Sequence, residues 1–503
     1  MTTDVLNSWA SWAANLNVGA IPDRVLQRAR LQHLSTAGAL HTTLAAGQSL
    51  GLGLGRGKVP VVGSKRKVGA AQALRYHAGN AAAWDYNDQL LWGSASAGVC
   101  ATWGEAAEAN LGELLAATVA ANELAGRVGA AGLLNPHSAT SWTAPQALGS
   151  AVAIAKLRGL DASDTADAMA LALSQGGVAS GLASSPVVRA RVAGSAAVSG
   201  LDAVNAAGEG IAGPRALLDD DRFFQALGCP VVLRNVFDQV GSAWLSEALW
   251  FKLTPGNPWH NVAFQALETI HDRHMRAADK RLRPDQWTHA EIRVPWPVWA
   301  AEAEVGREQL TWSLRTAYAV HSFTHQLSAE ELGEAFWAER GHEVAELASK
   351  IQVVHAWEHT IDALVGLLDH SGGLLGGLSI SQLKHALGAF RTALPDPGPP
   401  VGAELLELGK LHRFAGGVPA ASFDAAAFRY VLPMDVKVHT TRGGFWPETR
   451  SLPEGSPGWD WEDTLSRVQA KFGAGDPERA ERGAQLLLQD LDSGASGFVT
   501  ALG

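Results

Sequence analysis

The sequence predicts a mainly α-helical protein with a large helical domain, a smaller α+β domain, and C-terminal helices that pack back on the large domain. Three observations along the chain predict this class. Apolar residues recur at helical spacing from about residue 20 to 266, the period changes to two after about residue 287, and helical spacing returns after about residue 455. We therefore expect domains at residues 1–266 and 267–454, followed by C-terminal helices at 455–503.

The N-terminal part shows its helical character in spacing and in caps. One run carries apolar residues at i, i+3, i+4 and i+8, namely Leu111, Leu114, Leu115 and Val119. The stretch "GLDASDTADAMALAL" begins with Asp161 and Ser163, which are candidate N-caps. Alanine and glycine are abundant here, which favours close packing between helices.

The following part contains strands, a proline-rich loop and further helices. In "HAEIRVPW", Ala290, Ile292 and Val294 share one face of a strand, and the charged residues between them share the other. "MDVKVHTTRGG" alternates in the same way before a turn at Gly443 and Gly444. Proline excludes a helix from "PDPGPPVG", whereas "WDWEDTLSRVQAKF" returns to a helical pattern.

The composition excludes several classes of protein. A chain of 503 residues with 47% hydrophobic residues can bury a large core. Its net charge of −10 offers no basic footprint for nucleic acid, and its apolar runs are shorter than the roughly 20 residues of a membrane span. The N-terminus lacks the layout of a signal peptide, and Cys100 and Cys229 are the only cysteines, so we expect a soluble, cytoplasmic protein.

Two short motifs resemble sites of other protein classes without fitting them. "GLGLGRG" at residues 51–57 resembles a phosphate loop, but it follows a helical stretch and lacks the Lys-Ser/Thr ending. "GSASAG" resembles a nucleophile elbow, but Ser94 stands two places before Ser96, where the motif requires glycine. Phosphate binding and serine hydrolysis are therefore poorly supported.

Histidine pairs at helical spacing are candidates for metal binding. His321 and His325 form one pair; His355 and His359 form another, with Glu358 beside the latter. Neither pair reads H-E-x-x-H, and no third ligand is close to either in the sequence. We therefore expect no bound zinc or iron.

The stretch "AAAWDYNDQLLW" places Asp85 and Asp88 three residues apart, between Trp84 and Trp92. Carboxylate pairs are typical of proton transfer when their pKa values differ. Carboxylates in such positions also cap helices and hold the following loop. Both interpretations remain open for Asp85, whereas the structural one is favoured for Asp88.

Several stretches, in the same order, resemble segments of the MmgE/PrpD family. They are "IPDRVLQRARLQHLSTAGA", "GAAQALRYHAGNAAAWDYND", "GELLAATVAANELAGRVG", "FKLTPGNPWHNVAFQAL" and "WEDTLSRVQAKF". The resemblance implies a homodimer whose subunit has an all-helical large domain and a smaller α+β lid. It also implies chemistry without a metal or organic cofactor, in which a proton is removed or delivered at a carbon next to a carboxylate.

Matched residue by residue, the family's acidic motif falls on Asp85 and Asp88. Its lysine falls on Lys252, and its closing histidine falls on His260. The resemblance therefore implies catalytic roles for Asp85, Lys252 and His260. Lys252 can act as a base if desolvation lowers its pKa.

Other family positions carry different residues here. The first family His-Pro is replaced by Ser-Ala-Ser at 94–96, and the second histidine falls near Thr140, with His137 three residues upstream as a candidate replacement. A family lysine is replaced by arginine, which we assign to Arg189, with Arg191 nearby. Arginine binds a carboxylate with two hydrogen bonds, but it stays protonated and cannot act as a base.

The family tyrosine falls on Thr316, with Tyr318 two places on as a further substrate-binding candidate. Tryptophans stand beside the matched positions, among them Trp84, Trp142 and Trp259. Together with the lost histidines, they predict a pocket less polar than one built for a tricarboxylate.

Two functions remain open from the sequence. The first is a lyase or isomerase that acts on a small carboxylic acid. The second is a catalytically inactive member of the family that is retained for ligand binding or assembly. In either case we expect a homodimer, whose apolar face we assign to residues 111–125 and 165–180.

Overall fold

The structure is a computed structural model that describes residues 4–47, 49–51, 55–91, 93–136, 139–175 and 185–503. It is mainly α-helical, as the sequence predicts. The helices before residue 230 are α1 (Val5–Asn15), α2 (Asp23–Ala45), α3 (Ala70–Ala82), α4 (Ser96–Glu105), α5 (Leu111–Ala131), α6 (Ala139–Leu157), α7 (Ala162–Ser174), α8 (Pro186–Gly208) and α9 (Arg222–Ala226). The C-terminal helices are α18 (Trp461–Gly473), α19 (Pro477–Leu487) and α20 (Ala495–Ala501).

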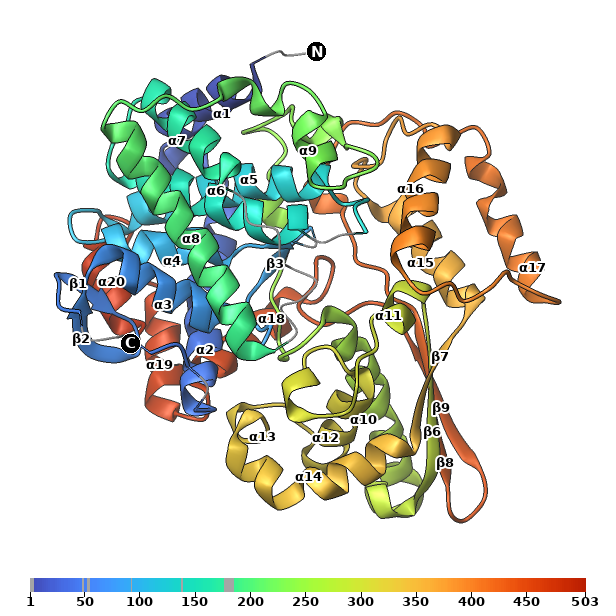
Figure 1. Cartoon of the computed structure of the whole chain (residues 1–503). Helices are drawn as coiled ribbons and strands as arrows, with labels where there is room; N and C mark the ends of the chain where they lie inside the picture. Colours follow the sequence, from blue (N-terminus) through green and yellow to red (C-terminus); the bar gives the residue numbers. More distant parts are fainter. Residues whose placement is uncertain (1–3, 48, 52–54, 92, 137–138, 176–184) are drawn as a thin grey trace.

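The middle of the chain combines helices with one larger sheet. Its helices are α10 (Pro258–Ala278), α11 (Trp296–Ala300), α12 (Leu314–Thr324), α13 (Ala329–Leu332), α14 (Glu334–Ser349), α15 (Trp357–His370), α16 (Ile380–Ala393) and α17 (Glu404–Glu407). Its strands are β6 (Trp287–Val294), β7 (Ile351–His355), β8 (Met434–Thr440) and β9 (Phe445–Arg450). In Figure 1 these elements lie beside the body formed by α1–α9 and α18–α20. The domain boundaries expected from the sequence remain a prediction.

The four-stranded sheet has the order β7-β6-β8-β9. β6 pairs with β7 in parallel and with β8 antiparallel, so Ile292 lies between Val353 and Val436. The alternation predicted for β6 is observed, because Ala290, Ile292 and Val294 are buried. α10 packs on β8 and β9.

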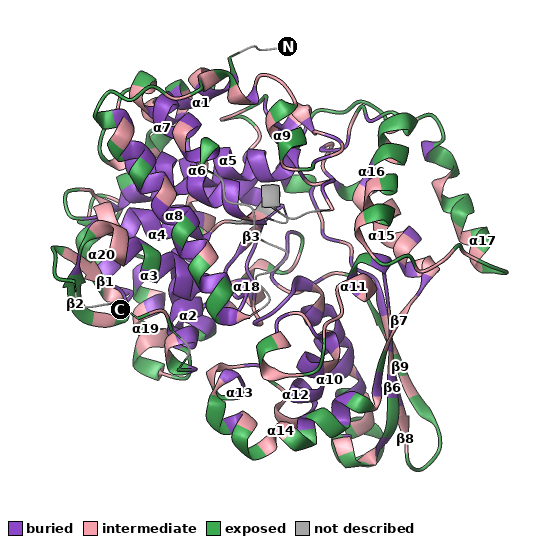
Figure 2. Ribbon diagram, viewed as in Figure 1, coloured by how far each residue is buried: buried purple, intermediate pink, exposed green. Residues whose placement is uncertain are grey.

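The helical body is organised around α5, in which every residue except Glu113 is buried. Figure 2 shows continuous burial through α4, α5 and α6. A helix that is buried on nearly all sides belongs in the core of a large protein. The prediction that residues 111–125 supply a dimer face is therefore wrong. Of the second predicted segment, most of α7 is buried as well, and residues 176–180 lie outside the described residues. The homodimer itself stays a prediction.

A fully buried ion pair ties α5 to the segment that leads into the candidate site. Arg127 Nη1 lies 2.8 Å from Glu123 Oε2, and neither side chain has exposed surface. Glu123 also accepts hydrogen bonds from the backbone N–H groups of Leu245 and Ser246, at 2.8 and 2.9 Å. Arg127 donates to the carbonyl of Ala243 at 2.8 Å. Because each charge is paired and hydrogen-bonded, the pair fixes the path of residues 243–246 across α5.

Short strands interrupt the large helical part, which is therefore not all-helical as expected. β1 (Val59–Val61) and β2 (Ser64–Val68) form an antiparallel hairpin. β3 (Gln89–Leu90) pairs with β4 (Gly93–Ser94) and with β5 (Leu249–Trp250). Strands of two to five residues leave too short a period-two signal to be recognised in a sequence.

The C-terminal helices contact helices of the N-terminal part of the chain. α18 and α19 contact α2, and α20 contacts α5. A Cβ atom on Gly38 of α2 would lie 2.9 Å from the backbone and side chain of Lys471 on α18. The missing side chain at Gly38 therefore lets α18 approach α2 closely.

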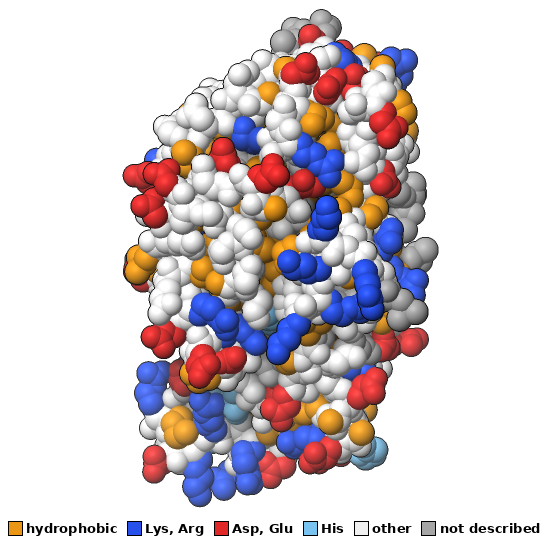
Figure 3. All heavy atoms as spheres, turned by 90° about the vertical axis from the view of Figure 1, so that its left-hand side faces the viewer, with side chains coloured by type: hydrophobic (Ala, Val, Ile, Leu, Met, Phe, Trp, Pro, Cys, Tyr) orange, Lys and Arg blue, Asp and Glu red, His pale blue; other side chains and the backbone are white. Residues whose placement is uncertain are grey.

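The surface mixes both signs of charge. Figure 3, which faces the side that carries β1 and β2 in Figure 1, shows lysine and arginine side chains gathered across the middle of this face. The hairpin strand β2 exposes Lys65, Arg66 and Lys67. Among the described residues, no helix combines the length and the apolar character needed to cross a membrane.

Glycine at the contact between α6 and α8 provides a test of the close packing. A Cβ atom on Gly200 would lie 2.4 Å from the carbonyl oxygen of Ala147. We predict that Gly200→Ala lowers the free energy of unfolding by about 1–3 kcal/mol, because the helices must separate. Gly208→Ala on the same helix has open space and should change it by less than about 1 kcal/mol. Urea denaturation of both variants measures the difference, and equal stabilities would contradict this account.

Candidate functional site

Pairing between two short strands brings the acidic loop to Lys252. β3 follows Asp88 directly, and its Gln89 lies opposite Trp250 of β5. Lys252, two residues further on, then donates its backbone N–H to Asp88 Oδ1 at 3.3 Å. Residues more than 160 positions apart in the sequence thus lie side by side.

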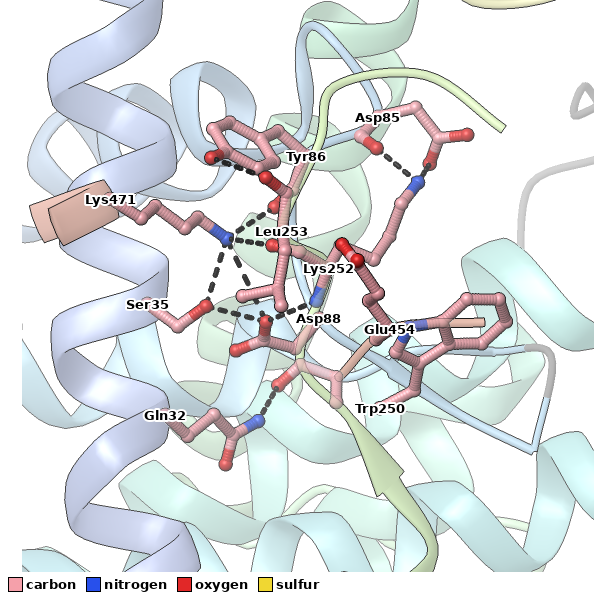
Figure 4. Close-up of polar contacts among 11 residues, drawn as sticks. Gln32, Ser35, Asp85, Tyr86, Asp88, Trp250, Lys252, Leu253, Glu454 and Lys471 are labelled. Atoms are coloured by element: carbon pink, nitrogen blue, oxygen red, sulfur yellow. Dashed lines mark hydrogen bonds and ion pairs between the residues drawn. The ribbon is translucent and has the colours of Figure 1, made fainter. Parts of the chain in front are cut away.

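One carboxylate oxygen of Asp85 forms ion pairs with two cationic side chains. Its Oδ1 lies 3.1 Å from Lys252 Nζ and 3.1 Å from Arg189 Nη1. Lys252 Nζ also donates to the carbonyl oxygen of Asp85, as Figure 4 shows. Asp85 has a positive φ of 51°, a conformation that aspartate tolerates better than most residues. This backbone conformation directs both its carbonyl and its carboxylate toward Lys252.

The three charged groups are nearly or fully buried, and their charges do not cancel. Lys252 has no exposed surface, and Asp85 and Arg189 expose only 4% each. Desolvation lowers the pKa of Lys252 to about 8, against the attraction of Asp85 and with the repulsion of Arg189. Two cations against one carboxylate leave a net positive site when Lys252 is protonated, which suits an anionic ligand.

Asp88 has the structural role that the sequence favoured. Its Oδ1 accepts a hydrogen bond from Ser35 Oγ at 2.6 Å and lies 3.8 Å from Lys471 Nζ. Burial raises the pKa of Asp88, and the neighbouring Lys471 opposes this. The carboxylate thus holds the loop and the start of β3 against α2.

Lys471 is a residue that the sequence analysis did not single out. Its Nζ donates to Ser35 Oγ at 2.8 Å and to the carbonyl oxygens of Tyr86 and Lys252 at 2.7 and 2.9 Å (Figure 4). Lys471 therefore clamps the acidic loop and the Lys252 segment together. Lys471 could have been selected from its place in the Lys-Phe helix, which resembles the closing segment of the family.

His260 reaches the site from the first turn of α10. The N–H of Gly256 donates to the Trp84 carbonyl at 2.9 Å, which docks the start of α10 on the acidic loop. A Cβ atom on Gly256, whose φ is 96°, would lie 2.7 Å from His260 Nδ1. Burial and the charge of Lys252 lower the pKa of His260 to about 3. His260 is therefore a neutral imidazole within the electrostatic influence of Lys252.

Tryptophans surround the Arg189 guanidinium. Its carbon Cζ lies 5.6 Å from the ring centre of Trp142 and 5.5 Å from that of Trp312. Trp259 contacts Trp312, with ring centres 6.5 Å apart. Trp312 was missed in the sequence analysis, although it stands just before the segment that was matched to the family tyrosine.

Buried polar atoms without a hydrogen-bond partner are concentrated around this cluster. Among the described residues they include Trp84 Nε1, Arg189 Nε and Nη2, Asn257 Nδ2, both ring nitrogens of His260, the side-chain amide of Asn261, and Trp312 Nε1. Asn257, His260 and Asn261 follow an i, i+3, i+4 spacing and therefore share one face of α10. Native proteins leave few buried polar groups unpaired, so this concentration is typical of a ligand site.

The remaining predicted site residues lie away from this cluster or outside the described residues. Arg191 is exposed on α8, because two helical positions separate it from the buried Arg189. Tyr318 is buried, with its ring 6.0 Å from Trp287 rather than beside Arg189. His137 and Trp92 lie outside the described residues.

Two cavities lined by described residues do not include the charged groups of this cluster. The larger, of about 570 Å³, is lined by residues 45–47 at the end of α2 and by residues between Thr324 and Arg340. Asp85, Arg189 and Lys252 line neither cavity. α8 follows residues 176–184, which lie outside the description.

The N-terminal part of the chain matches a known family. A family model described as the MmgE/PrpD N-terminal domain matches residues 7–230, which include Asp85 and Arg189. Lys252 and His260 lie beyond the matched range. No curated protein matches the chain.

Asp85 allows a direct test of the buried charge cluster. Asp85→Asn keeps a residue that tolerates positive φ but leaves Lys252 and Arg189 without their countercharge. We predict a loss of about 3–5 kcal/mol in the free energy of unfolding, because an uncompensated buried charge is costly. The control, Asp285→Asn in an exposed pair with Arg283, should change it by less than about 0.5 kcal/mol. Calorimetry or denaturant unfolding compares the two, and an equally small effect of both substitutions would contradict the assignment.

Proposed function

The chain belongs to the MmgE/PrpD family, and on this premise we propose that it is a lyase or isomerase that transfers a proton at a carbon next to a carboxylate of a small organic acid. At the level of the family, a lyase-like role such as dehydration is indicated. The observation that carries the proposal for this chain is the group of unsatisfied buried hydrogen-bonding atoms around a net positive cluster. A bound carboxylate would satisfy several of these donors at once.

Arg189 is the proposed anchor of the substrate carboxylate. Its Nη1 is engaged by Asp85, whereas Nε and Nη2 have no partner among the described residues. These two nitrogens can donate the paired hydrogen bonds that a planar carboxylate accepts. The two tryptophan faces exclude water from the guanidinium, which strengthens its electrostatic attraction for the ligand.

Lys252 is the proposed base. With a pKa lowered to about 8, a useful fraction of Lys252 is neutral near neutral pH. In the proposed step its Nζ accepts the proton from the carbon next to the carboxylate, and the bonding electrons move into the carboxylate. Arg189 then stabilises the negative charge that develops there. Asp85 orients both cations. His260, as a neutral imidazole, donates a hydrogen bond to the bound acid.

The walls of the proposed site favour a mostly apolar ligand. Trp142 and Trp312 face the Arg189 guanidinium, which is the proposed anchoring group, and Trp259 contacts Trp312. Tricarboxylates need several cations, and Lys252 is already engaged by Asp85. A monocarboxylate with a ring or branched apolar body fits this arrangement better.

An inactive family member that binds a ligand or serves in assembly is the second candidate. It is favoured by the pairing of Asp85 and Lys252 in a buried cluster and by the absence of histidine at two family positions. Under this function the ligand binds at Arg189, but no proton is exchanged. The homodimer predicted from the sequence is part of both proposals.

Ligand preference tests the substrate class. We predict that 3-phenylpropionate and isovalerate raise Tm and bind in calorimetry, whereas citrate, 2-methylcitrate and cis-aconitate bind at least about 10-fold more weakly because one anchoring group serves one carboxylate. Arg189→Met should abolish this binding, while Arg191→Met, at an exposed position two residues away, should retain it. Efficient turnover of 2-methylcitrate or cis-aconitate would contradict the proposed preference.

The pH dependence of proton exchange tests the role of Lys252. We predict that the purified chain exchanges the hydrogen next to the carboxylate of a bound acid with deuterium from D₂O, detected by NMR. Since the neutral amine is the base, the rate should rise about 10-fold per pH unit below pH 8 and level off above it.

Lys252→Met should reduce this exchange by at least about 100-fold. The control Lys65→Met removes an exposed lysine of β2 and should leave the rate unchanged. Exchange that persists in Lys252→Met rules Lys252 out as the base. Binding without any exchange in the unmodified chain selects the inactive function instead.

A further inference from the structure

A second cluster of potential ligand side chains lies between α10 and α12. Glu268 and His271 stand three residues apart on α10, and His321 and His325 stand at the end of α12. One ligand atom from each of Glu268, His271 and His325 lies within 4.8 Å of the other two. In the sequence the histidine pair had no third ligand nearby, but the fold supplies a carboxylate and an imidazole from another helix.

The distances around Glu268 are close to those of a four-coordinate metal site. Glu268 Oε1 lies 3.1 Å from His325 Nδ1 and 3.7 Å from His321 Nδ1. The rings of His271 and His325 meet edge to face, with centres 4.6 Å apart. Ligand atoms about 2.1 Å from a tetrahedral zinc ion lie about 3.4 Å from one another, which is close to the two separations from Glu268 Oε1.

The buried histidines of the cluster lack partners. Both ring nitrogens of His271 and Nδ1 of His321 have no hydrogen-bond partner among the described residues. His271 has no exposed surface, and His321 exposes 6%. Leaving such nitrogens unsatisfied is costly, and a shared metal ion would satisfy them together. The partly exposed side chains of Glu268 and His325, at 34% and 27%, provide an entry path for the ion.

We propose that Glu268, His271 and His325 bind a divalent transition-metal ion such as Zn²⁺, with His321 as the fourth ligand. Imidazole and carboxylate are the ligands that such ions prefer in this number and geometry. This site is separate from the cluster around Asp85 and does not depend on the proposed function.

The metal would fix the spacing of two helices that also carry the candidate active site. His260 and His271 are eleven residues apart on α10, about 16 Å at 1.5 Å per residue. Phe264 stands between them, with its ring 6.1 Å from His260 and stacked on His321 at 4.3 Å. Trp312 directly precedes Ser313, the N-cap of α12. The ion therefore has a structural role in joining α10 to α12 and takes no part in the proton transfer.

The test uses the full-length chain, stripped with a chelator and dialysed against Zn²⁺ or Co²⁺ at low micromolar concentration. We expect about one metal ion per chain by elemental analysis, visible Co²⁺ absorption of four-coordinate intensity, and a Tm that rises with metal concentration. The double variant His271→Gln with His325→Gln removes two metal ligands, so its affinity for the metal ion should fall by more than about 100-fold.

The matched control removes another adjacent histidine pair. His289 and His439 stack at 3.9 Å on β6 and β8, and replacing both with Gln should leave the stoichiometry and the Co²⁺ spectrum unchanged. Clearly substoichiometric binding by the unmodified chain, or full binding by the His271/His325 double variant, overturns the proposal. If circular dichroism shows that this double variant is unfolded, His325→Gln at the partly exposed ligand decides the question by the same criteria.

Discussion

The buried carboxylate of Asp85 is the interaction on which the candidate site depends. Lys252 and Arg189 come from segments that are far apart in the sequence, and both bind the same oxygen of Asp85. Two buried cations would repel each other, so neither could stay buried without this anion. The same arrangement leaves one positive charge uncompensated, which is why a structural ion cluster can also serve as an anion site.

Buried polar contacts hold the backbone of the site in place from three directions. The pair of Glu123 and Arg127 on α5 fixes the segment before β5, and the pairing of β5 with β3 then sets Lys252 beside the acidic loop. Lys471 of α18 closes the arrangement by binding two backbone carbonyls. Each contact joins the core of the helical body to a loop, so the positions of the charged groups follow from the packing of that body.

One face of α10 connects two regions with different chemistry. Its first turn carries His260, which feels the charge of Lys252, and three turns later it presents Glu268 and His271 to α12. Both regions contain buried nitrogens that have no hydrogen-bond partner in the described part of the chain, and the stacked Phe264 separates them. Sequence spacing along α10 alone could not reveal either region, because the partners of each come from other elements.

The sequence by itself determined the mainly helical class, the strands β6 and β8 of the larger sheet, and the selection of Asp85, Arg189, Lys252 and His260 as candidates. These follow from local periodicity and from motif order, which a linear chain displays directly. Only the tertiary structure decided which of them meet, that Arg191 is exposed, that α5 is buried rather than available to a partner chain, and that Lys471 and Trp312 complete the surroundings. The physical reason is that burial, ion pairing and shared ligands are contacts between distant segments, and no local pattern specifies the partner across the core.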